Sequence, residues 1–579
     1  MVKQLLNYTI KVVLLFAITT FIYFNGFAQE KKDSVIFRYP LNVKMSLSGN
    51  YGELRSSHFH NGIDFRVGGV VGAPIFAAED GYISRIVVSP TGYGRGVYIT
   101  HNKGFVTVYG HLDSFADNIR DYVLNKQYES EQFDQDLYFT DKEFPIKKGD
   151  FIGRAGNSGS SGGPHLHFEI RDSLNVPLNV FKRRFLHVKD NTPPIFYGVA
   201  FYGYNDDSGV AQRYYIGREL NENGFSSKYS KGNVVMLPYK SYVAIDAVDI
   251  MEGTPAKLAV EEYKVFIDNN LLFHYKVGEV PFNLGKYINS LLEYRQKAIR
   301  KRPFIKTYVE PGNLLKDRIK YVNNGLIVLE DTLKHTLKIE VLDYLKNKKS
   351  RIYTIQKDTS LFSNIIDTIV GDQVNWYVPN IISKNGLDVY IPAGALYSTM
   401  YLNIDSLAAS KFLTPMYKVG DEVIPLHKQI SLSFNCSLPD SYIGKQVIIK
   451  IQDDGNLGAV MANYNKDKKR VEGEVYSFGQ YAVGVDLEPP TITSSIKENA
   501  VVKGDKIIFR VKDDLSGIKK YRAEIDGKWV LAEYDAKTKR IIVPLNYAKI
   551  GGGKQKIILE VEDGVGNKER ISRNFSWSR

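Results

Sequence analysis

The chain has 579 residues, of which 44% are hydrophobic and 24% are charged, and its formal net charge is +12. This length exceeds what one hydrophobic core supports and the apolar content excludes a disordered chain, so we expect three to five globular domains. The basic charge suits either a polyanionic partner surface or simple solubility, and no motif for binding nucleic acid accompanies it.

Residues 1–28 have the pattern of a secretory signal peptide. Lys3 and Lys11 precede an apolar run over residues 12–24, and small residues precede an expected cut after Ala28. The alternative is an uncleaved membrane anchor, but thirteen apolar residues are short for a span, which needs about 20. We therefore expect an exported chain whose mature part does not span a membrane. Cys436 is the only cysteine, which excludes an internal disulfide.

Four folded units are expected after this segment, and their composition favours a mainly β fold. Tyr, Phe, Val and Ile are abundant and long helical periodicities are few. The first unit covers residues 29–187, and six of the ten histidines lie between positions 58 and 167. We expect an immunoglobulin-like β domain over 188–358, a β-rich domain over 359–486 and a second immunoglobulin-like domain over 487–579. The last three units are thus about three β-sandwich-like domains.

An internal repeat supports this division. "DNTPPIF" at Asp190 matches "DLEPPTI" at Asp486, "YKVFID" matches "YRAEID", and "EVLDYLKNK" matches "EVEDGVGNK", in the same order. Each copy begins at a Pro-Pro hinge and ends in an alternating strand and a polar turn, as small β-sandwiches do. The first copy is longer, which predicts an insertion at about 286–330 that includes the basic, helical or looped segment "EYRQKAIRKRPF".

Histidines in the first unit are spaced as in a metal site. In "GGPHLHFEI", His165 and His167 project from the same face of an expected strand, with apolar residues on the other face. His60 and Asp64 lie four residues apart in "HFHNGIDF", and His111 follows a β-type run in "VYGHLDSF". Imidazole nitrogens and one carboxylate suit zinc, with three protein ligands and a fourth position for water. The sequence has no H-E-x-x-H motif, which excludes the glutamate base of the common zinc proteases.

Three stretches resemble the successive motifs of the lysostaphin-like (LytM-type, M23) zinc metallopeptidases: "HNGIDF", "GYGRGVYITHNKGFVTVYGHL" and "KKGDFIGRAGNSGSSGGPHLHFEI". The match covers less than a third of the chain. The resemblance implies a lysostaphin-like antiparallel β-sheet peptidase domain with one zinc ion per chain. It also implies that His60, Asp64 and His167 bind the metal, and that His111 and His165 are catalytic histidines outside the ligand set.

The same resemblance implies a mechanism and a substrate. A zinc-bound water attacks a peptide carbonyl, while one free histidine orients or deprotonates this water and the other stabilises the oxyanion or protonates the leaving amine. The implied substrate is the stem-peptide cross-links of bacterial peptidoglycan, in the periplasm or cell envelope or outside the cell. One alternative is a catalytically silent envelope protein that binds the wall or regulates other wall hydrolases. Another is a scaffold whose β domains contact envelope proteins.

Four neighbouring residues and one segment carry weaker expectations. His58 is expected not to touch the metal, and His101 to be a structural histidine at a strand end. Glu169 either orients a metal ligand from behind or forms an ordinary salt bridge. Arg95 stands near a position where family members often have asparagine and alters the cleft wall. The long segment 117–144, acidic and aromatic, either restricts access to the substrate groove or is a neutral surface insertion.

Overall fold

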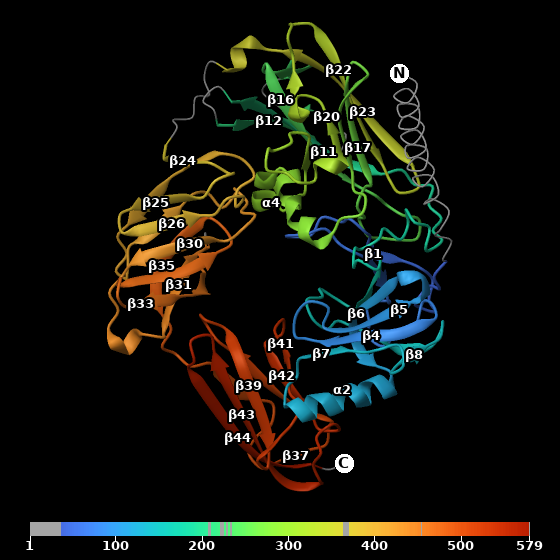
Figure 1. Ribbon diagram of the computed structural model, residues 1–579, viewed down its shortest axis with the longest axis vertical. Helices are drawn as coiled ribbons and strands as arrows, with labels where there is room; N and C mark the ends of the chain where they lie inside the picture. The colour runs from blue at the N-terminus through green and yellow to red at the C-terminus, as the bar shows by residue number, and fades with distance from the viewer. Residues whose placement is uncertain are drawn as a thin grey trace, which may run out of the picture.

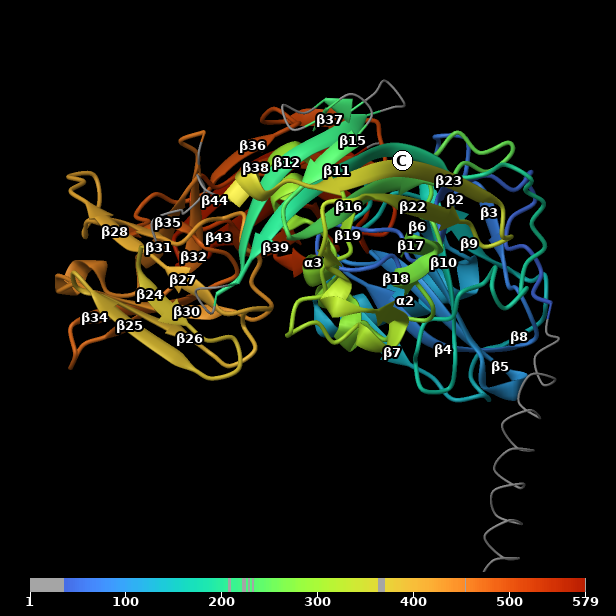
Figure 2. The same cartoon turned by 90° about the horizontal axis from the view of Figure 1, so that it is seen from above.

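The computed structural model describes residues 36–206, 210–220, 225–226, 230–231, 234–362, 370–452 and 454–577. The expected signal peptide lies outside the described residues. Among those residues, no helix is both long and apolar enough to cross a membrane. The chain forms four β-rich units that follow one another around a ring, and the last unit returns to the first (Figure 1). The view from above places the second unit between the first and the third (Figure 2). The mainly β fold class is confirmed.

The first unit is a ten-stranded antiparallel sheet. Its main strand order is β1-β2-β10-β6-β5-β4-β7, with β8 paired to β4 and with β9 joining β6 to β3. The strands are β1 (Leu47–Gly49), β2 (Ile63–Arg66), β3 (Pro74–Phe76), β4 (Gly81–Val88), β5 (Arg95–His101), β6 (Val106–Phe115), β7 (Gln135–Tyr138), β8 (Pro145–Ile146), β9 (Phe151–Ala155) and β10 (His165–Arg171). One α-helix, α2 (Asp117–Ser130), follows β6.

Alternation along β10 separates the core from the site. Leu166, Phe168 and Ile170 are all 0% exposed and belong to the core of the first unit. The side chains between them point to the opposite face because successive strand residues alternate. His165 and His167 therefore share the face away from this core, as the sequence predicts.

The second unit packs two sheets over one core. The sheets have the orders β13-β12-β11-β16-β19, with β21 also on β16, and β14-β15-β23-β22-β17-β18-β20. The strands are β11 (Ile195–Asn205), β12 (Gln212–Leu220), β13 (Phe225–Ser226), β14 (Ser230–Lys231), β15 (Val234–Leu237), β16 (Lys240–Val248), β17 (Glu262–Ile267), β18 (Asn270–Lys276), β19 (Ile305–Lys306), β20 (Ile319–Tyr321), β21 (Ile327–Val328), β22 (Lys334–Leu342) and β23 (Lys348–Lys357). A 3₁₀ helix (Phe282–Tyr287) leads into the segment of the predicted insertion, which contains α3 (Ile288–Leu291) and α4 (Tyr294–Arg300).

The third unit contains two five-stranded sheets and one short strand pair. The sheets are β25-β26-β30-β34-β33 and β28-β29-β35-β31-β32, and β24 pairs with β27. The strands are β24 (Asp372–Val374), β25 (Asn380–Lys384), β26 (Leu387–Ile391), β27 (Met400–Leu402), β28 (Ile404–Leu407), β29 (Met416–Val419), β30 (Ile430–Asn435), β31 (Gln446–Ile451), β32 (Leu457–Met461), β33 (Asn463–Asn465), β34 (Arg470–Val475) and β35 (Gly479–Val485). Side chains from both sheets share one apolar core.

The fourth unit repeats the strand pairing of the second. Its sheets are β36-β38-β42-β41 and β37-β44-β43-β39-β40. The strands are β36 (Thr491–Ser494), β37 (Ala500–Val502), β38 (Lys506–Lys512), β39 (Ile518–Ile525), β40 (Lys528–Trp529), β41 (Glu533–Asp535), β42 (Arg540–Pro544), β43 (Gly553–Asp563) and β44 (Lys568–Trp577). The pair β11 and β16 corresponds to β36 and β38, and the hairpin β22–β23 to β43–β44. In each unit the last strand also has a parallel partner, β15 or β37.

A loop of the first unit is shared with the second. Tyr51 and Phe59, each 1% exposed, belong to the apolar core of the second unit although they precede β2. Asn50 exchanges two hydrogen bonds with the backbone of Ala259, at 3.0 and 2.7 Å. The Tyr51 hydroxyl accepts from the Val280 N–H at 2.9 Å. The residues that lead into the "HFHNGIDF" motif are thus anchored in a neighbouring domain.

The segment 117–144 lies at the far edge of the first sheet and contacts the fourth unit. It forms α2 and β7, and β7 pairs with β4 at the opposite end of the strand order from β1 and β2. The Tyr128 hydroxyl donates to the carbonyl oxygen of Tyr547 at 2.9 Å, and Glu131 pairs with Arg522 at 2.7 Å. Closing the ring is therefore one role of this segment, a role the sequence did not indicate.

Candidate active site

Three neighbouring strands bring the histidine motifs together at one end of the first sheet. Asp64 on β2 lies directly opposite His167 on β10, and His167 lies opposite Gly110 on β6. A Cβ at Gly110 would come within 3.0 Å of the Tyr93 ring and 3.4 Å of the His167 Cβ. Glycine is therefore needed there for the rings to approach this closely.

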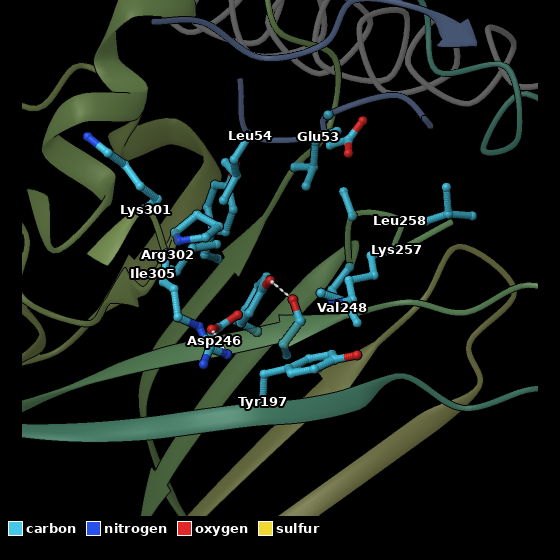
Figure 3. A pocket seen from close by; sticks show the side chains of 18 residues that line it. Glu53, Leu54, Tyr197, Asp246, Val248, Lys257, Leu258, Lys301, Arg302 and Ile305 are labelled. Atoms are coloured by element: carbon cyan, nitrogen blue, oxygen red, sulfur yellow. Dashed lines mark hydrogen bonds and ion pairs between the residues drawn. The ribbon is translucent and has the colours of Figure 1, made fainter. Parts of the chain in front are cut away.

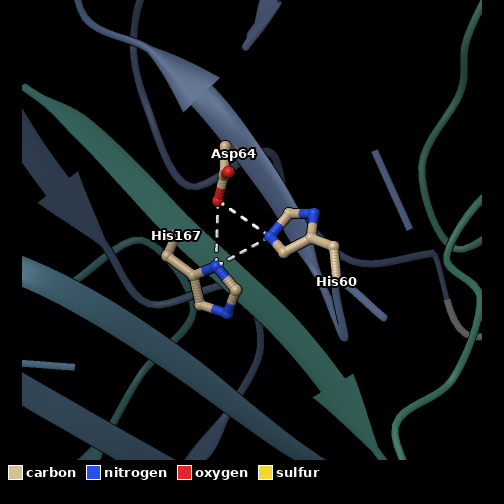
Figure 4. Close-up of side chains that lie close together, drawn as sticks. All are labelled: His60, Asp64 and His167. Carbon is tan, nitrogen blue, oxygen red and sulfur yellow. Dashed lines mark hydrogen bonds and ion pairs between the residues drawn. The ribbon is translucent and has the colours of Figure 1, made fainter. Parts of the chain in front are cut away.

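His60, Asp64 and His167 form a compact cluster (Figure 4). The His60 Nε2 lies 3.0 Å from the Asp64 Oδ1 and 3.1 Å from the His167 Nδ1, and the last two atoms lie 2.9 Å apart. All three residues are at least nine-tenths buried. Ligands at about 2.0–2.1 Å around a tetrahedral zinc ion lie about 3.3 Å from one another, so this spacing is close to that of a zinc site.

In His60 and His167, the ring nitrogen that points away from the cluster forms a hydrogen bond. The His60 Nδ1–H donates to the carbonyl oxygen of Asn50 at 2.8 Å. The His167 Nε2 lies 2.8 Å from the Glu169 Oε1. Since the outer nitrogens are engaged, each ring turns its other nitrogen towards the cluster, where it can bind a metal once it is deprotonated.

Glu169 is itself held by a buried network. The side chain is 0% exposed, its Oε2 accepts from the Arg171 Nε at 2.7 Å, and its Oε1 accepts from the Tyr93 hydroxyl at 2.5 Å. Burial opposes the ionisation of Glu169, but Arg171 and His167 together outweigh it and lower the pKa of Glu169 to about 2. Of the two roles expected for Glu169, the geometry favours orientation of His167 over an isolated surface salt bridge.

The charges in the cluster differ strongly among its members. Burial opposes the ionisation of Asp64, but the surrounding imidazoles outweigh it and hold the pKa of Asp64 well below its usual range. Burial lowers the pKa of His60. Burial also acts against protonated His167, yet hydrogen bonds to Asp64 and Glu169 raise its pKa to about 9. In the metal-free protein, His167 is therefore the member that holds a proton at neutral pH.

His111 and His165 lie beside the cluster with one ring nitrogen each tied to the backbone. The His111 Nδ1–H donates to the Ser158 carbonyl at 2.9 Å, and the His165 Nδ1–H to the Gly163 carbonyl at 2.8 Å. Their ring centroids lie 4.8 Å apart, and the His165 Nε2 is 3.4 Å from the Asp64 Oδ1. In this tautomer each Nε2 carries a lone pair and is available to accept a proton.

A backbone irregularity directs His111 towards the cleft. This residue has φ of +64°, which is uncommon for a side chain other than glycine, and it lies where β6 slips against β5 and β9. Burial, and next the charge of His167 and His165, lower the pKa of His111 to about 3. His111 is therefore neutral at neutral pH.

The five predicted site residues line one cavity of about 530 Å³. His58 also lines it but stays outside the three-residue cluster.

His101 lies elsewhere, at the end of β5, with its ring nitrogens bonded to the Asp80 carbonyl at 2.9 Å and to the Thr107 hydroxyl at 2.7 Å. No residue of 117–144 lines this cavity, although Phe133 lines an adjoining one.

Three residues at the site were not indicated by the sequence motifs. The Arg55 Nη2 lies 2.6 Å from the Asp64 Oδ2 and 2.9 Å from the Glu53 Oε2. Asn50 supports His60 through its carbonyl, and Tyr93 supports Glu169. Arg95, expected to alter the cleft wall, instead pairs with Glu533 of the fourth unit at 2.6 Å. The contacts of Arg55 and Asn50 span at most 10 residues of sequence, whereas Tyr93 and Arg95 contact residues 76 and 438 positions away.

A second cavity, of about 470 Å³, lies between the first two units, next to residues 52–54 of the loop that they share. Glu53 and Leu54 form one side, while Tyr197, Asp246 and Ile305 belong to the second unit (Figure 3). The cavity contains none of the histidines. Glu53, which lines this cavity, pairs with Arg55, and Arg55 pairs with Asp64 of the cluster.

Comparison with known proteins places two families along the chain. Residues 58–128 match the sequence profile of peptidase family M23, and residues 371–486 match that of the Zu5-like domain. An uncharacterized metalloprotease of Haemophilus influenzae is 30% identical over 139 residues, 23% of this chain and 24% of that protein. The peptidoglycan DD-endopeptidase ShyA of Vibrio cholerae is 29% identical over 139 residues, 23% of this chain and 26% of that protein.

Among solved structures, a zinc-containing peptidase from Vibrio cholerae is similar, with 25% sequence identity over 25% of this chain and 39% of that chain and a TM-score of 0.19. The chain spans about a quarter of the length of the curated relatives it matches. The profile match falls on the unit that the sequence motifs singled out, and the predicted resemblance is confirmed. Residues 58–128 of the first unit thus match peptidase family M23.

Proposed function

We propose that this protein is an exported zinc endopeptidase that hydrolyses peptide cross-links of bacterial peptidoglycan. The observation that carries the proposal is the convergence of the His60 Nε2, the Asp64 Oδ1 and the His167 Nδ1 within 3.1 Å of one another, beside two further imidazoles. The M23 match supports a peptidase. The relatives named as peptidoglycan endopeptidases support the choice of substrate.

The donor set fits zinc. Two imidazole nitrogens and one carboxylate oxygen are ligands that zinc prefers, and three protein ligands leave a position open, as catalytic zinc sites require. The buried Glu169 behind His167 and the Asn50 carbonyl behind His60 orient the two rings. When bound, zinc would polarise the scissile carbonyl and activate a water molecule for attack.

The two remaining histidines would handle protons. Each has its Nδ1–H tied to a backbone carbonyl, so each presents Nε2 to the cavity. His111 is neutral and would take the proton of the attacking water at Nε2. The His165 Nε2 lies 3.4 Å from the Asp64 Oδ1, and once this nitrogen has taken up a proton it would donate to the developing oxyanion or to the leaving amine.

The cavity has the size and polarity that a peptide requires. Its volume of about 530 Å³ lies within the usual range for sites that bind small ligands. Arg55, Asn61 and Tyr93 line it together with the backbone of the glycine-rich stretch at Gly162. Hydrogen-bonding groups along the walls would hold an extended stem peptide across the cluster.

The test combines metal content with product analysis. Purified full-length protein should contain about one zinc ion per chain and should release cross-link-derived muropeptides from isolated wall, whereas His167→Ala should lose both properties. The exposed His187 provides a matched control, because His187→Ala removes an imidazole outside the cavity. Zinc binding without wall cleavage would overturn the enzymatic proposal and favour a silent wall-binding or regulatory protein. A wild type without zinc would overturn the metal assignment.

A further inference from the structure

The second unit contains a cluster of three buried aspartates where it joins the first unit. Asp190, Asp249 and Asp343 each offer one carboxylate oxygen, and these oxygens lie within 4.8 Å of one another. The residues are 6%, 3% and 2% exposed. They line a cavity of about 20 Å³ together with Asn50 and Phe181 of the first unit. A cavity of this volume has room for a single ion or water molecule.

Two of the buried residues in this cluster, Asp190 and Asp249, each have one carboxylate oxygen without a hydrogen-bond partner among the described residues. Asp249 accepts only the N–H of Ile250, through its Oδ1 at 2.9 Å, so within the described residues its Oδ2 has no partner. Asp190 accepts two backbone N–H groups through its Oδ1, and its Oδ2 is likewise without a partner there. Carboxylate oxygens of buried residues that face a small cavity without a protein partner can bind a cation there.

The fourth unit carries the same arrangement at equivalent positions. Asp486, Asp513 and Asp563 offer oxygens within 4.8 Å of one another. Asp190 and Asp486 stand five residues before β11 and β36, and Asp249 and Asp513 directly follow β16 and β38. In this second cluster the Asp486 Oδ1 also has no partner among the described residues, because only the Oδ2 accepts, from the Ser516 N–H at 3.1 Å.

An asparagine completes each cluster in the same way. The Asn347 Nδ2 donates to the Asp343 Oδ2 at 2.7 Å and to the Asp190 carbonyl at 3.1 Å. The Asn567 Nδ2 makes the two corresponding bonds to Asp563 and Asp486 at the same distances. The repeat has thus kept both the carboxylates and the contact that holds them together.

The charge of these clusters is not balanced by protein cations. Within the described residues, no lysine or arginine forms an ion pair with any of the six aspartates. Burial raises the pKa of Asp249 to about 8, and the charges of Asp343 and Asp190 add to this effect. Such mutual repulsion is removed when a cation binds between the carboxylates.

We propose that each of the two repeated β units binds one calcium ion through its three aspartates. The ligand atoms are oxygens only, which favours a hard cation over zinc. Ligand oxygens at about 2.4 Å from calcium lie up to about 4.8 Å apart, and the oxygens of each cluster lie within this limit. Each ion would fasten the start of its unit to the ends of two strands, at the junction with the preceding unit.

The test is a calcium titration of the full-length protein, stripped of metal and then reloaded with one equivalent of zinc. Calorimetry with CaCl₂ at about pH 8 should give two bound ions per chain. Asp190→Asn and Asp486→Asn should each reduce this number to one, and the double variant should bind none. The exposed Asp121 supplies the control, since Asp121→Asn should still bind two ions.

Melting temperatures distinguish a variant that has lost the calcium site from a variant that has failed to fold. Calcium should raise the melting temperature of the wild type. Without calcium, each Asn variant should melt at or above the wild-type temperature, because one like charge has been removed. Asp249→Asn and Asp513→Asn replace any variant that fails to fold. A wild type without calcium heat or stabilisation, a stoichiometry unchanged in both single variants, or equally tight binding of MgCl₂ would overturn the calcium assignment.

Discussion

Zinc binding by the metal-free protein should tighten about tenfold for each pH unit between about pH 6.5 and pH 8.5. Only one of the three clustered residues holds a proton in this range. The pKa of His167 is raised to about 9, whereas those of His60 and Asp64 are lowered. A metal ligand must be deprotonated, so zinc must displace one proton, and a lower pH opposes binding.

The size of the loss in zinc affinity follows from the difference between the pH and the pKa of His167. Removing a proton two units below its pKa costs about 2.7 kcal/mol, which weakens the apparent affinity about 100-fold at pH 7 relative to pH above 9. The plot of log Kd against pH should therefore have a slope near −1 below about pH 9 and should flatten above it.

Competition with a chromogenic zinc chelator at several pH values measures this slope. Calorimetry in two buffers of different ionisation enthalpy counts the released protons independently, and about one is expected. A slope near zero would mean that His167 is already neutral. A slope of −2 or steeper would mean that His60 or Asp64 is also protonated. Either result refutes the charge distribution derived from the Asp64 and Glu169 contacts.

Three further outcomes test separate contacts. Glu169→Gln should weaken zinc binding at about pH 9 by about 10- to 100-fold because the support behind His167 is lost, and an unchanged Kd would contradict that support. His111→Ala should keep its zinc but release muropeptides about 10²- to 10⁴-fold more slowly, whereas loss of zinc would place it among the ligands. Arg95→Ala and Glu533→Ala should show a coupling of about 1 kcal/mol in a double-mutant cycle of denaturant unfolding, and additive effects would mean that the ion pair does not join the two units.

The site motifs were predictable because they depend on local periodicity. Alternation in a strand is enough to place His165 and His167 on one face, and the M23 resemblance supplies the rest of the candidate set. The pairing of β2 with β10, which sets Asp64 opposite His167, is a long-range register that the residues alone do not specify. The internal repeat likewise anticipated two units that share one strand pairing.

The remaining parts of the site depend on contacts between distant segments. Arg55 reaches Asp64 from a loop whose path is set by the core of the second unit. The segment 117–144 follows His111 closely in sequence, but none of its residues lines the cavity and it contacts the fourth unit. The positions of Arg55 and of the segment 117–144 depend on tertiary packing and cannot be read from composition.

Sharing the loop of residues 50–59 means that the first unit is not an independent module. A fragment cut at the end of the first sheet would turn Tyr51 and Phe59 out into water, each with an apolar surface of about 150–250 Å². It would also release the backbone carbonyl that orients His60. Shortened forms and domain exchanges should therefore retain the second unit, since metal affinity is expected to depend on a neighbour that contributes no ligand.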